Sequence, residues 1–270
     1  MRTVLALTSH VAASSVGAAA LLCLAPVRRA RVIFAPTVLY GRHPGHGAPG
    51  GAAVSEARLA GLLEGVEAAG AFKELSAVMT GYLANAGQTG LAVHAIETAR
   101  AQNPEVFILV DPIIGDESSG VYADEGAAFA IRDALVPRAD LITPNAFELA
   151  WLTGRDVTSV EDALAASEAV SAAAVLCSSV PAGDQMGVVY QDGNEAWAVR
   201  HERFAAAPHG TGDLLAAAFL LSRLSGASVK DALESAVGAV LAAIKASASG
   251  ELDLHAALRA ESGPEAQTLD

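Results

Sequence analysis

The stretch VFILVDP, residues 106–112, decides the fold of this chain. Its first five residues (106–110) are all apolar, and Asp111 and Pro112 follow them. A short, continuous apolar run bounded by such residues is typical of a strand that is buried on both faces of a parallel sheet. Similar runs occur on both sides of it along the chain, and segments with helical character separate them. This recurrence predicts alternating strands and helices.

The alternation predicts an α/β protein with three layers, in which helices cover both faces of a mainly parallel central sheet. A strand that is apolar on both faces must be covered on both faces, and helices that connect parallel strands provide that cover. The expected strands are residues 3–9, 31–40, 76–82, 106–112, 140–145 and 173–179, and the expected helices between them are 15–25, 55–70, 86–101, 124–135 and 160–170.

The pattern changes after residue 180. Two strand-like segments flank DGN (192–194), which is a hairpin signal, so we expect an antiparallel hairpin at one edge of the sheet. Two further helices are expected at 211–224 and 229–247. Because no linker interrupts the pattern, we expect a single domain over residues 1–260, followed by a disordered polar tail over 261–270.

Composition excludes several classes of function. Acidic residues outnumber basic ones by 30 to 17, and a net charge of −13 disfavours nucleic acid as a partner. Two cysteines without a CxxC spacing predict no disulfide framework. The longest apolar run near the N-terminus, residues 16–27, contains Pro26 and is too short to span a bilayer. We therefore expect a cytoplasmic protein without a membrane partner.

One connection is unusually long and rich in glycine and proline. The segment GRHPGHGAPGGAA (41–53) follows an expected strand, and loops of this kind are often lids over a binding site. It contains GHGAPG, which matches the GxGxxG pattern of dinucleotide-binding proteins. That match is rejected, because Pro49 interrupts it and no helix follows it directly.

Polar residues follow the expected strands at their carboxyl ends, where ligands of open α/β sheets bind. Oxygen ligands gathered at one edge of a sheet suit Mg²⁺, which takes one or two carboxylates together with substrate phosphates. The alternative is structural: Asp111 only ends a strand, and Asn145 and Glu148 cap a short helix. The residues concerned are Ser9, His10, Tyr82, Asp111, Asp116, Thr143, Asn145, Glu148, Ser178 and Ser179.

The stretch HGTGDLLAAAFLL (209–221) predicts an anion-binding turn before a buried helix. Gly210 and Gly212 allow a tight turn whose backbone N–H groups point outward and hold a phosphoryl group. Asp213 then lies where an attacking hydroxyl could pass its proton to it. The alternative is a helix that is simply capped by Thr211 or Asp213. The sequence contains no GxxxxGK[ST], so a phosphotransferase of the P-loop type is excluded.

The motifs DPIIGD, TPNAFE and HGTGD, in this order, resemble those of the ribokinase-like small-molecule kinases. The segments SHV (9–11), TGY (80–82) and ITPNAFE (142–148) are similar to the pyridoxal kinase branch of that superfamily. The resemblance covers residues 2–247. It implies the ribokinase-like fold and transfer of the γ-phosphate of ATP to the 5′-hydroxyl of pyridoxal, pyridoxine or pyridoxamine, in vitamin B6 salvage.

The resemblance also implies roles for individual residues. Asp213 would be the general base, and Gly210, Thr211 and Gly212 would stabilise the transferring phosphoryl group. The metal ligands for Mg²⁺ would be Asp111, Asp116 and Glu148, and the family is usually homodimeric. Contacts to ATP would come from Asp111, Thr143, Asn145, Glu148 and Ser178, and contacts to the B6 vitamer from Ser9, Val38, His43 and Tyr82.

The sequence departs from the family pattern at two positions. Ala18 follows Gly17 where the family commonly has asparagine, and Pro44 follows His43 where it commonly has threonine. Both changes fall on the vitamin side, so they leave two alternatives open. One is a related kinase that acts on hydroxymethylpyrimidine or another small alcohol, and the other is a catalytically weak B6-binding protein. The sequence does not specify the natural acceptor or any monovalent-ion requirement.

Overall fold

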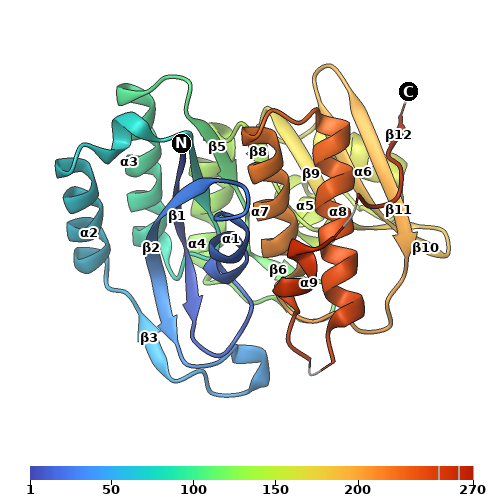
Figure 1. Cartoon of the computed structure of the whole chain (residues 1–270), viewed down its shortest axis with the longest axis horizontal. Coiled ribbons are helices and arrows are strands. Elements are labelled where there is room, and N and C mark those ends of the chain that lie inside the picture. The colour runs from blue at the N-terminus through green and yellow to red at the C-terminus, as the bar shows by residue number, and fades with distance from the viewer. Residues whose placement is uncertain (249, 261, 270) are drawn as a thin grey trace.

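The computed structural model describes residues 1–248, 250–260 and 262–269 (Figure 1). Ten strands form one sheet in the order β12-β11-β10-β9-β8-β5-β4-β1-β2-β3, and β6 and β7 form a separate ribbon. The strands are β1 (Arg2–Val11), β2 (Ala30–Tyr40), β3 (Gly51–Ala53), β4 (Ala77–Thr80), β5 (Phe107–Val110), β6 (Gly115–Asp116), β7 (Gly120–Val121), β8 (Leu141–Ile142), β9 (Ala174–Ala182), β10 (Gln185–Asp192), β11 (Ala196–Glu202) and β12 (Gln267–Thr268). The helices are α1 (Ala18–Leu24), α2 (Glu56–Ala68), α3 (Ala86–Gln102), α4 (Glu125–Ala130), α5 (Ala146–Thr153), α6 (Val160–Ser167), α7 (Thr211–Leu224), α8 (Val229–Ala246) and α9 (Leu254–Leu258).

The centre of the sheet is parallel, as predicted. Strands β2, β1, β4, β5, β8 and β9 pair in parallel. Strands β10 and β11 extend the sheet in the antiparallel direction, which confirms the predicted hairpin. At the opposite edge, β3 pairs antiparallel with β2. None of the described helices is long and apolar enough to cross a membrane.

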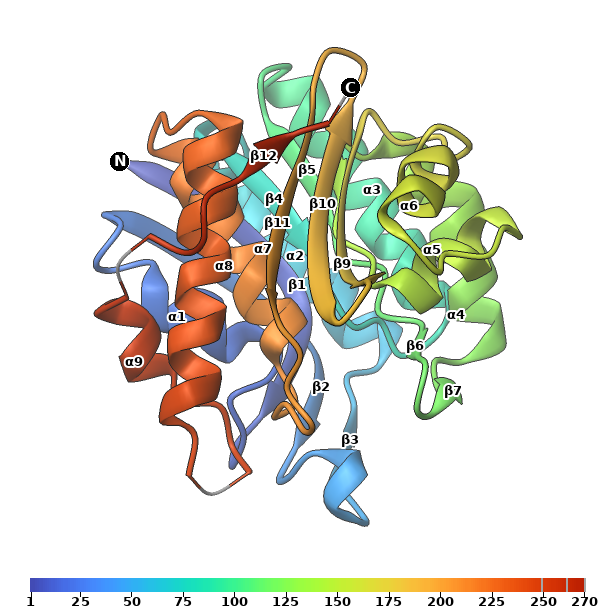
Figure 2. The same ribbon diagram turned by 90° about the vertical axis from the view of Figure 1, so that its right-hand side faces the viewer.

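Helices cover both faces of the sheet, which explains the continuous apolar runs. Successive residues of β1 point to opposite faces: Val4 and Ala6 belong to one core cluster, and Leu5 and Leu7 belong to the other. The first cluster includes residues of α1, α7, α8 and α9, and the second includes residues of α2 to α6. Figure 2 shows the sheet between these two helical layers. The expected three-layer architecture is therefore confirmed.

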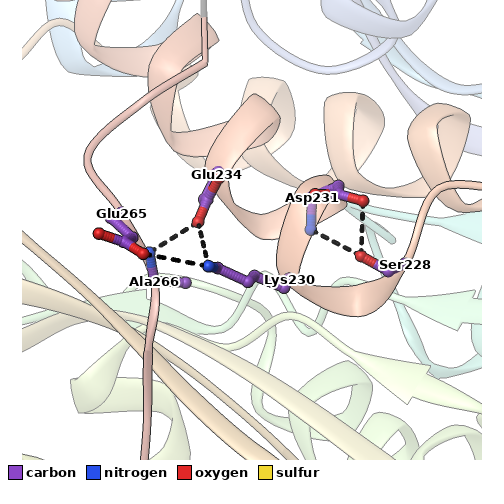
Figure 3. A network of polar contacts seen from close by, with 6 residues as sticks. All are labelled: Ser228, Lys230, Asp231, Glu234, Glu265 and Ala266. Carbon is purple, nitrogen blue, oxygen red and sulfur yellow. Dashed lines mark hydrogen bonds and ion pairs between the residues drawn. The ribbon is translucent and has the colours of Figure 1, made fainter.

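The C-terminal segment is ordered, so the prediction of a disordered tail is wrong for residues 262–269. Strand β12 pairs with β11, and Leu269 N–H donates to the Ala196 carbonyl at 2.9 Å. Farther back, Ala266 N–H donates to Glu234 Oε1 on α8 at 2.9 Å (Figure 3). The polarity of the tail was misleading, because backbone groups make these contacts and their partners lie far away in the sequence.

Close packing also holds the tail against α8. The Gly263 N–H donates to the Glu234 carbonyl at 2.9 Å, and a Cβ at Gly263 would lie 2.6 Å from the Gly238 nitrogen. Figure 3 shows that Lys230 links Glu234 to Glu265. Exposed ion pairs contribute little, so we attribute the docking mainly to the backbone contact between two glycines.

The expected lid is an ordered arm. Residues 51–53 form β3 against β2, and Pro44–His46 form a single 3₁₀ turn. Buried Gln88 of α3 ties the base of the arm together, because its side-chain amide donates to the carbonyls of Thr37 and Val54 at 2.9 and 2.8 Å. The base of the arm is therefore anchored on both strands, and its tip extends beyond the edge of the sheet.

Candidate active site

The polar residues predicted at the carboxyl ends of the strands do come together. Asp111 follows β5, and Thr143 and Asn145 follow β8. Asn145 Nδ2 donates to the Gly115 carbonyl at 2.9 Å, which joins the loop after β8 to the loop after β5. Asn145 also forms an isolated parallel bridge with Ser178 of β9. Neighbouring parallel strands end side by side, and this places the segments at one edge of the sheet.

Three carboxylates dominate the electrostatics of this edge. Burial raises the pKa of Asp111 well above its usual range, and the nearby Asp213 and Glu148 raise it further, against the opposing effect of the Thr143 hydroxyl. Burial likewise raises the pKa of Glu148 to about 8. Among the described residues, no ion pair links Asp111, Glu148 or Asp213 to a basic side chain. These carboxyls therefore tend to hold their protons while no cation is bound, and a cation beside them would favour their ionised form.

Glu148 has its oxygens engaged by backbone groups. Its Oε1 accepts from the N–H of Ile114 at 2.9 Å, and its Oε2 accepts from the N–H of Asn145 at 2.9 Å. Together with the bond from Glu148 N–H to Asn145 Oδ1, this forms a capping box at the start of α5. The structural alternative for Asn145 and Glu148 is thus present, and it fixes both side chains at the edge of the site.

Asp116 lies in a turn of its own. Its Oδ1 accepts from Ser118 N–H at 2.9 Å, Ser118 Oγ at 2.7 Å and Ser119 N–H at 2.7 Å in the β6–β7 ribbon. Over the part of the chain that the structure describes, no three His, Cys, Asp or Glu side chains are grouped closely enough to hold a metal ion by themselves. Any Mg²⁺ at this edge would therefore need ligands from a bound phosphate as well.

The start of α7 is open to an anion. Gly210 has a φ of +95° and turns the chain into the helix, whose first N-terminal hydrogen bond runs from Leu214 N–H to the Gly210 carbonyl at 3.0 Å. No side chain caps this helix, so the predicted alternative of a cap by Thr211 or Asp213 is wrong. The N–H groups of the first turn are thus left for a ligand, at the positive end of the helix dipole.

Asp213 lies in this first turn and is partly accessible. Burial raises the pKa of its carboxyl to about 6, and the backbone N–H of Gly17 acts in the opposite direction by hydrogen bonding to it. Gly17, with a φ of +64°, belongs to the turn between β1 and α1. A carboxyl with this pKa, held by a neighbouring turn, is suited to accept a proton near neutral pH.

The residues expected on the vitamin side come from β1, β2, the segment after β4 and the lid. Ser9 is buried at the end of β1, directly under Gly17. The carbonyl of half-buried Tyr82 accepts from Thr37 Oγ1 at 2.6 Å. Val38 is fully buried in β2, and His43 lies in the lid with its ring stacked on His209 at 4.1 Å between centroids. Two residues differ from the family pattern. Ala18 is buried in α1, and Pro44 begins the 3₁₀ turn that His43 caps.

Sequence reasoning missed Tyr122, which follows β7. The residue is half exposed, but partial burial of its hydroxyl raises the pKa of that group, and the charges of Glu148 and Asp111 raise it further. The sequence contained no signal for it, because its neighbours come from other segments of the chain.

Sequence reasoning also missed an apolar cavity of about 200 Å³ next to the start of α7. Ser179 at its wall has a φ of +57°, which is uncommon for a residue other than glycine and marks the irregular pairing of β9 with β10. The cavity is lined by Ser178, Ser179, Met186, Val188, His201, Arg203, Phe204, Ala207, Thr211, Gly212, Leu215, Val237, Val240, Leu241 and Ile244. A second cavity, of about 610 Å³, lies at the other end of β9 and contains no predicted site residue.

Comparisons with known proteins show the family of this chain. A family model described as phosphomethylpyrimidine kinase matches residues 63–255. A pyridoxine/pyridoxal/pyridoxamine kinase of Bordetella avium is 36% identical over 220 residues, which cover 78% of this chain and 74% of that protein. Pyridoxal kinase PdxY of Granulibacter bethesdensis is 30% identical over 264 residues, which cover 93% of this chain and 92% of that protein.

Solved structures share the fold. Pyridoxal kinase from Leishmania donovani in complex with ADP and pyridoxamine superposes with a TM-score of 0.93 at 20% identity, covering 100% of both chains. Pyridoxal kinase from Staphylococcus aureus in complex with AMP-PCP superposes with a TM-score of 0.84 at 23% identity, covering 100% of this chain and 99% of that chain. With these relatives and this site, the chain belongs to the pyridoxal kinase family of the ribokinase-like superfamily.

Proposed function

We propose that this protein transfers the γ-phosphate of ATP to the 5′-hydroxyl of pyridoxal, pyridoxine or pyridoxamine, in vitamin B6 salvage. The observation that carries the proposal is the placement of Asp213 in the uncapped first turn of α7. A base and a set of free backbone N–H groups then lie on adjacent residues. This is the arrangement that transfer of a phosphoryl group to an alcohol requires.

In this mechanism Asp213 accepts the proton of the acceptor hydroxyl as its oxygen attacks the γ-phosphorus. The bond from that phosphorus to the β,γ-bridging oxygen breaks, and ADP leaves. The backbone of Gly210, Thr211 and Gly212 donates hydrogen bonds to the charge that builds up on the transferring group. The pKa of Asp213, about 6, leaves the carboxylate deprotonated at neutral pH while it remains basic enough to take a proton.

The apolar cavity beside α7 suits the base of the nucleotide. Met186, Val188 and Leu241 give it apolar walls, while Ser178 and Thr211 lie on the side of the phosphate turn. Thr143 and Asn145, at the ends of neighbouring strands, are then positioned toward the phosphates.

We expect Val240→Trp, which fills the cavity, to raise the KM for ATP at least about tenfold, since it removes a buried contact worth more than about 1.4 kcal/mol. Steady-state kinetics with varied ATP measure this, and an unchanged KM for ATP would place the nucleotide elsewhere.

The chemistry of the site fits a bound Mg²⁺. Asp111, Asp116 and Glu148 would supply carboxyl oxygens, and among the described residues no basic side chain pairs with the buried Asp111 and Glu148. When bound, Mg²⁺ would neutralise phosphate charge. Backbone groups already engage both carboxyl oxygens of Glu148 and Oδ1 of Asp116, so we expect Asp111 to be the principal ligand.

On the vitamin side, Ser9, Val38, His43 and Tyr82 would hold the pyridine ring and the lid would exclude water. A panel of acceptors tests the function, with ATP consumption and the phosphorylated product as readouts. We expect the largest kcat/KM with a B6 vitamer. The description of the matched family model favours hydroxymethylpyrimidine as a second candidate, and turnover with that alcohol alone would reverse the assignment. Pyridoxal binding without turnover at saturating Mg·ATP would indicate a binding protein.

A cytoplasmic homodimer is part of the same proposal, because the family resemblance implies the dimer and the N-terminal sequence favours the cytoplasm. Sedimentation equilibrium of the purified protein tests the assembly. A single species with the mass of one chain, 27.3 kDa, across a wide concentration range would contradict it.

A further inference from the structure

Three histidines from two distant segments meet above the phosphate turn. His43 and His46 lie in the lid, and His209 directly precedes Gly210. The ring centroid of His46 is 5.8 Å from that of His43 and 5.6 Å from that of His209, and the rings of His43 and His209 stack at 4.1 Å. These contacts hold the tip of the lid against the segment that leads into α7.

Glu251 joins this cluster to a third segment. Its Oε1 lies 3.7 Å from Nδ1 of His46. Its Oε2 accepts hydrogen bonds from Ser14 Oγ at 2.9 Å and from Ser15 N–H at 3.1 Å. Residue 251 also forms an isolated parallel bridge with His209. One half-exposed carboxylate therefore contacts the lid, the turn after β1 and the approach to α7.

The turn that Glu251 holds also positions the catalytic base. Ser14 and Ser15 lead into Gly17, whose N–H lies near enough to the Asp213 carboxyl to lower its pKa. The same turn packs on the phosphate loop, since a Cβ on Gly210 would lie 3.0 Å from the Ser15 carbonyl oxygen. A shift of Ser14 and Ser15 would therefore move both the partner of the base and the wall of the anion site.

We propose that Glu251 is a positioning residue of the kinase reaction, which latches the closed lid through His46 and holds the turn that orients Asp213. The proposal rests on the proposed function for its kinetic consequences. We call the set of His43, His46, His209 and Glu251 the latch. Glu251 does not touch the reacting atoms, and it acts through the lid on one side and through Gly17 on the other.

The latch makes lid closure sensitive to pH. Its titratable groups are the three imidazoles and Glu251, and on the lid itself the Arg42 guanidinium donates to the Ala48 carbonyl at 2.8 Å. The negative charge of Glu251 offsets the positive charge of one imidazolium. A second imidazolium in the same stacked cluster repels the first. His43 Nδ1 also accepts from Gly45 N–H at 3.1 Å, a bond that an imidazolium cannot accept. Acid should therefore open the lid.

The pKa of His43 agrees with this geometry. Burial lowers it first, and the neighbouring His209 and His46 lower it further, while Glu251 acts in the opposite direction. His43 is therefore held neutral while the lid is closed. Removing the charge of Glu251 lowers the affinity of the cluster for protons, so the acid opening moves to lower pH.

The experiment compares Glu251→Gln, Glu251→Ala and His46→Gln in the full chain, with Glu97→Gln as the control. Glu97 pairs with Arg138 on the surface of α3, so its amide should leave the kinetics unchanged. Glutamine at 251 can still accept from Ser14 and Ser15 but loses the charge facing His46. We expect it to raise the acceptor KM about fivefold, as for loss of one polar contact of the lid, and to shift the acid limb of kcat/KM to lower pH.

The other two variants separate the two ends of the latch. Glu251→Ala also removes the acceptor for Ser14 and Ser15, so we expect kcat to fall about tenfold in addition to the change in KM. His46→Gln should raise KM as Glu251→Gln does and leave kcat unchanged. An acid limb that does not move in Glu251→Gln, or a kcat for Glu251→Ala equal to that of Glu97→Gln, would overturn the proposal.

Hydrogen exchange keeps this test separate from the proposed function. In the wild-type protein we expect the amides of residues 41–50 to be protected at neutral pH, and to lose protection in Glu251→Gln but not in Glu97→Gln. This expected difference in exchange does not depend on turnover. If no B6 vitamer is phosphorylated, the proposed function is wrong but the latch proposal is unaffected. Equal protection of the lid in both variants would overturn the latch.

Discussion

Asp213→Asn is expected to lower kcat by about three orders of magnitude while making the protein more stable at neutral pH. Asparagine has nearly the shape of aspartate and can still accept the hydrogen bond of Gly17 N–H, but it cannot take the proton of the acceptor hydroxyl. The KM values for ATP and for the acceptor should change little, because the base is used in the transition state. Steady-state kinetics with both substrates varied measure the effect.

The gain in stability follows from the direction of the pKa shift. Folding raises the pKa of Asp213 to about 6, so the folded state binds this proton more tightly than the unfolded state does. The carboxyl therefore costs stability once the pH rises from about 4 through 6, and the cost is at most about 3 kcal/mol because the side chain is partly accessible. Asparagine has no such cost.

Urea unfolding checks this second half of the prediction. At pH 7 the free energy of unfolding should be larger for Asp213→Asn than for the wild type. This difference should shrink as the pH falls below about 4, where the wild-type carboxyl is protonated in both the folded and the unfolded state. Asp133→Asn is the control: Asp133 is exposed, and the Arg132 guanidinium lowers its pKa, so this variant should keep its activity and gain no stability at pH 7. A variant that keeps more than about a tenth of the wild-type kcat would show that Asp213 is not the base.

Gly17→Ala is expected to lower both stability and kcat. Gly17 combines a φ of +64° with a ψ of −130°, a conformation that residues with a Cβ rarely adopt. A Cβ there would also overlap Ser9 Oγ and the Ser9 carbonyl oxygen. We expect a loss of about 2 to 5 kcal/mol from backbone strain and overpacking together. The turn must move to relieve the overlap, and this changes the surroundings of the Asp213 carboxyl.

Gly61→Ala provides the matched control for this substitution. Gly61 lies within α2, its added Cβ would meet open space, and alanine is favoured there by about 1 kcal/mol. We therefore expect Gly61→Ala to raise the temperature of unfolding slightly and to leave kcat unchanged. If Gly17→Ala keeps wild-type stability and turnover, the turn after β1 does not position the base.

Much of the architecture could be predicted from the local pattern. The run of apolar residues in β5 and in the strands beside it requires cover on both faces, so a parallel sheet between helices follows. Since parallel strands end at a common edge, Asp111, Thr143 and Asn145 could be placed together. The glycines before α7 likewise predicted an open helix start, and the structure adds that no side chain caps it.

Other features could not be predicted, because their partners are remote in the sequence. Tyr122 lies beside carboxylates of three other segments. The polar tail of the chain docks through the backbone at Gly263 and β12, which its composition does not reveal. The bond from Ser14 to Glu251 joins residues 237 positions apart, and nothing in either neighbourhood predicts it.

The sequence by itself therefore determined the layers of the fold, the edge where the chemistry lies and the helix whose start meets the phosphate, because periodicity and strand ends are local properties. Only the tertiary structure decided how Asp213 is held by Gly17 and how the lid reaches His209 and Glu251. Those contacts depend on how distant turns pack against one another, and packing of that kind has no local signature.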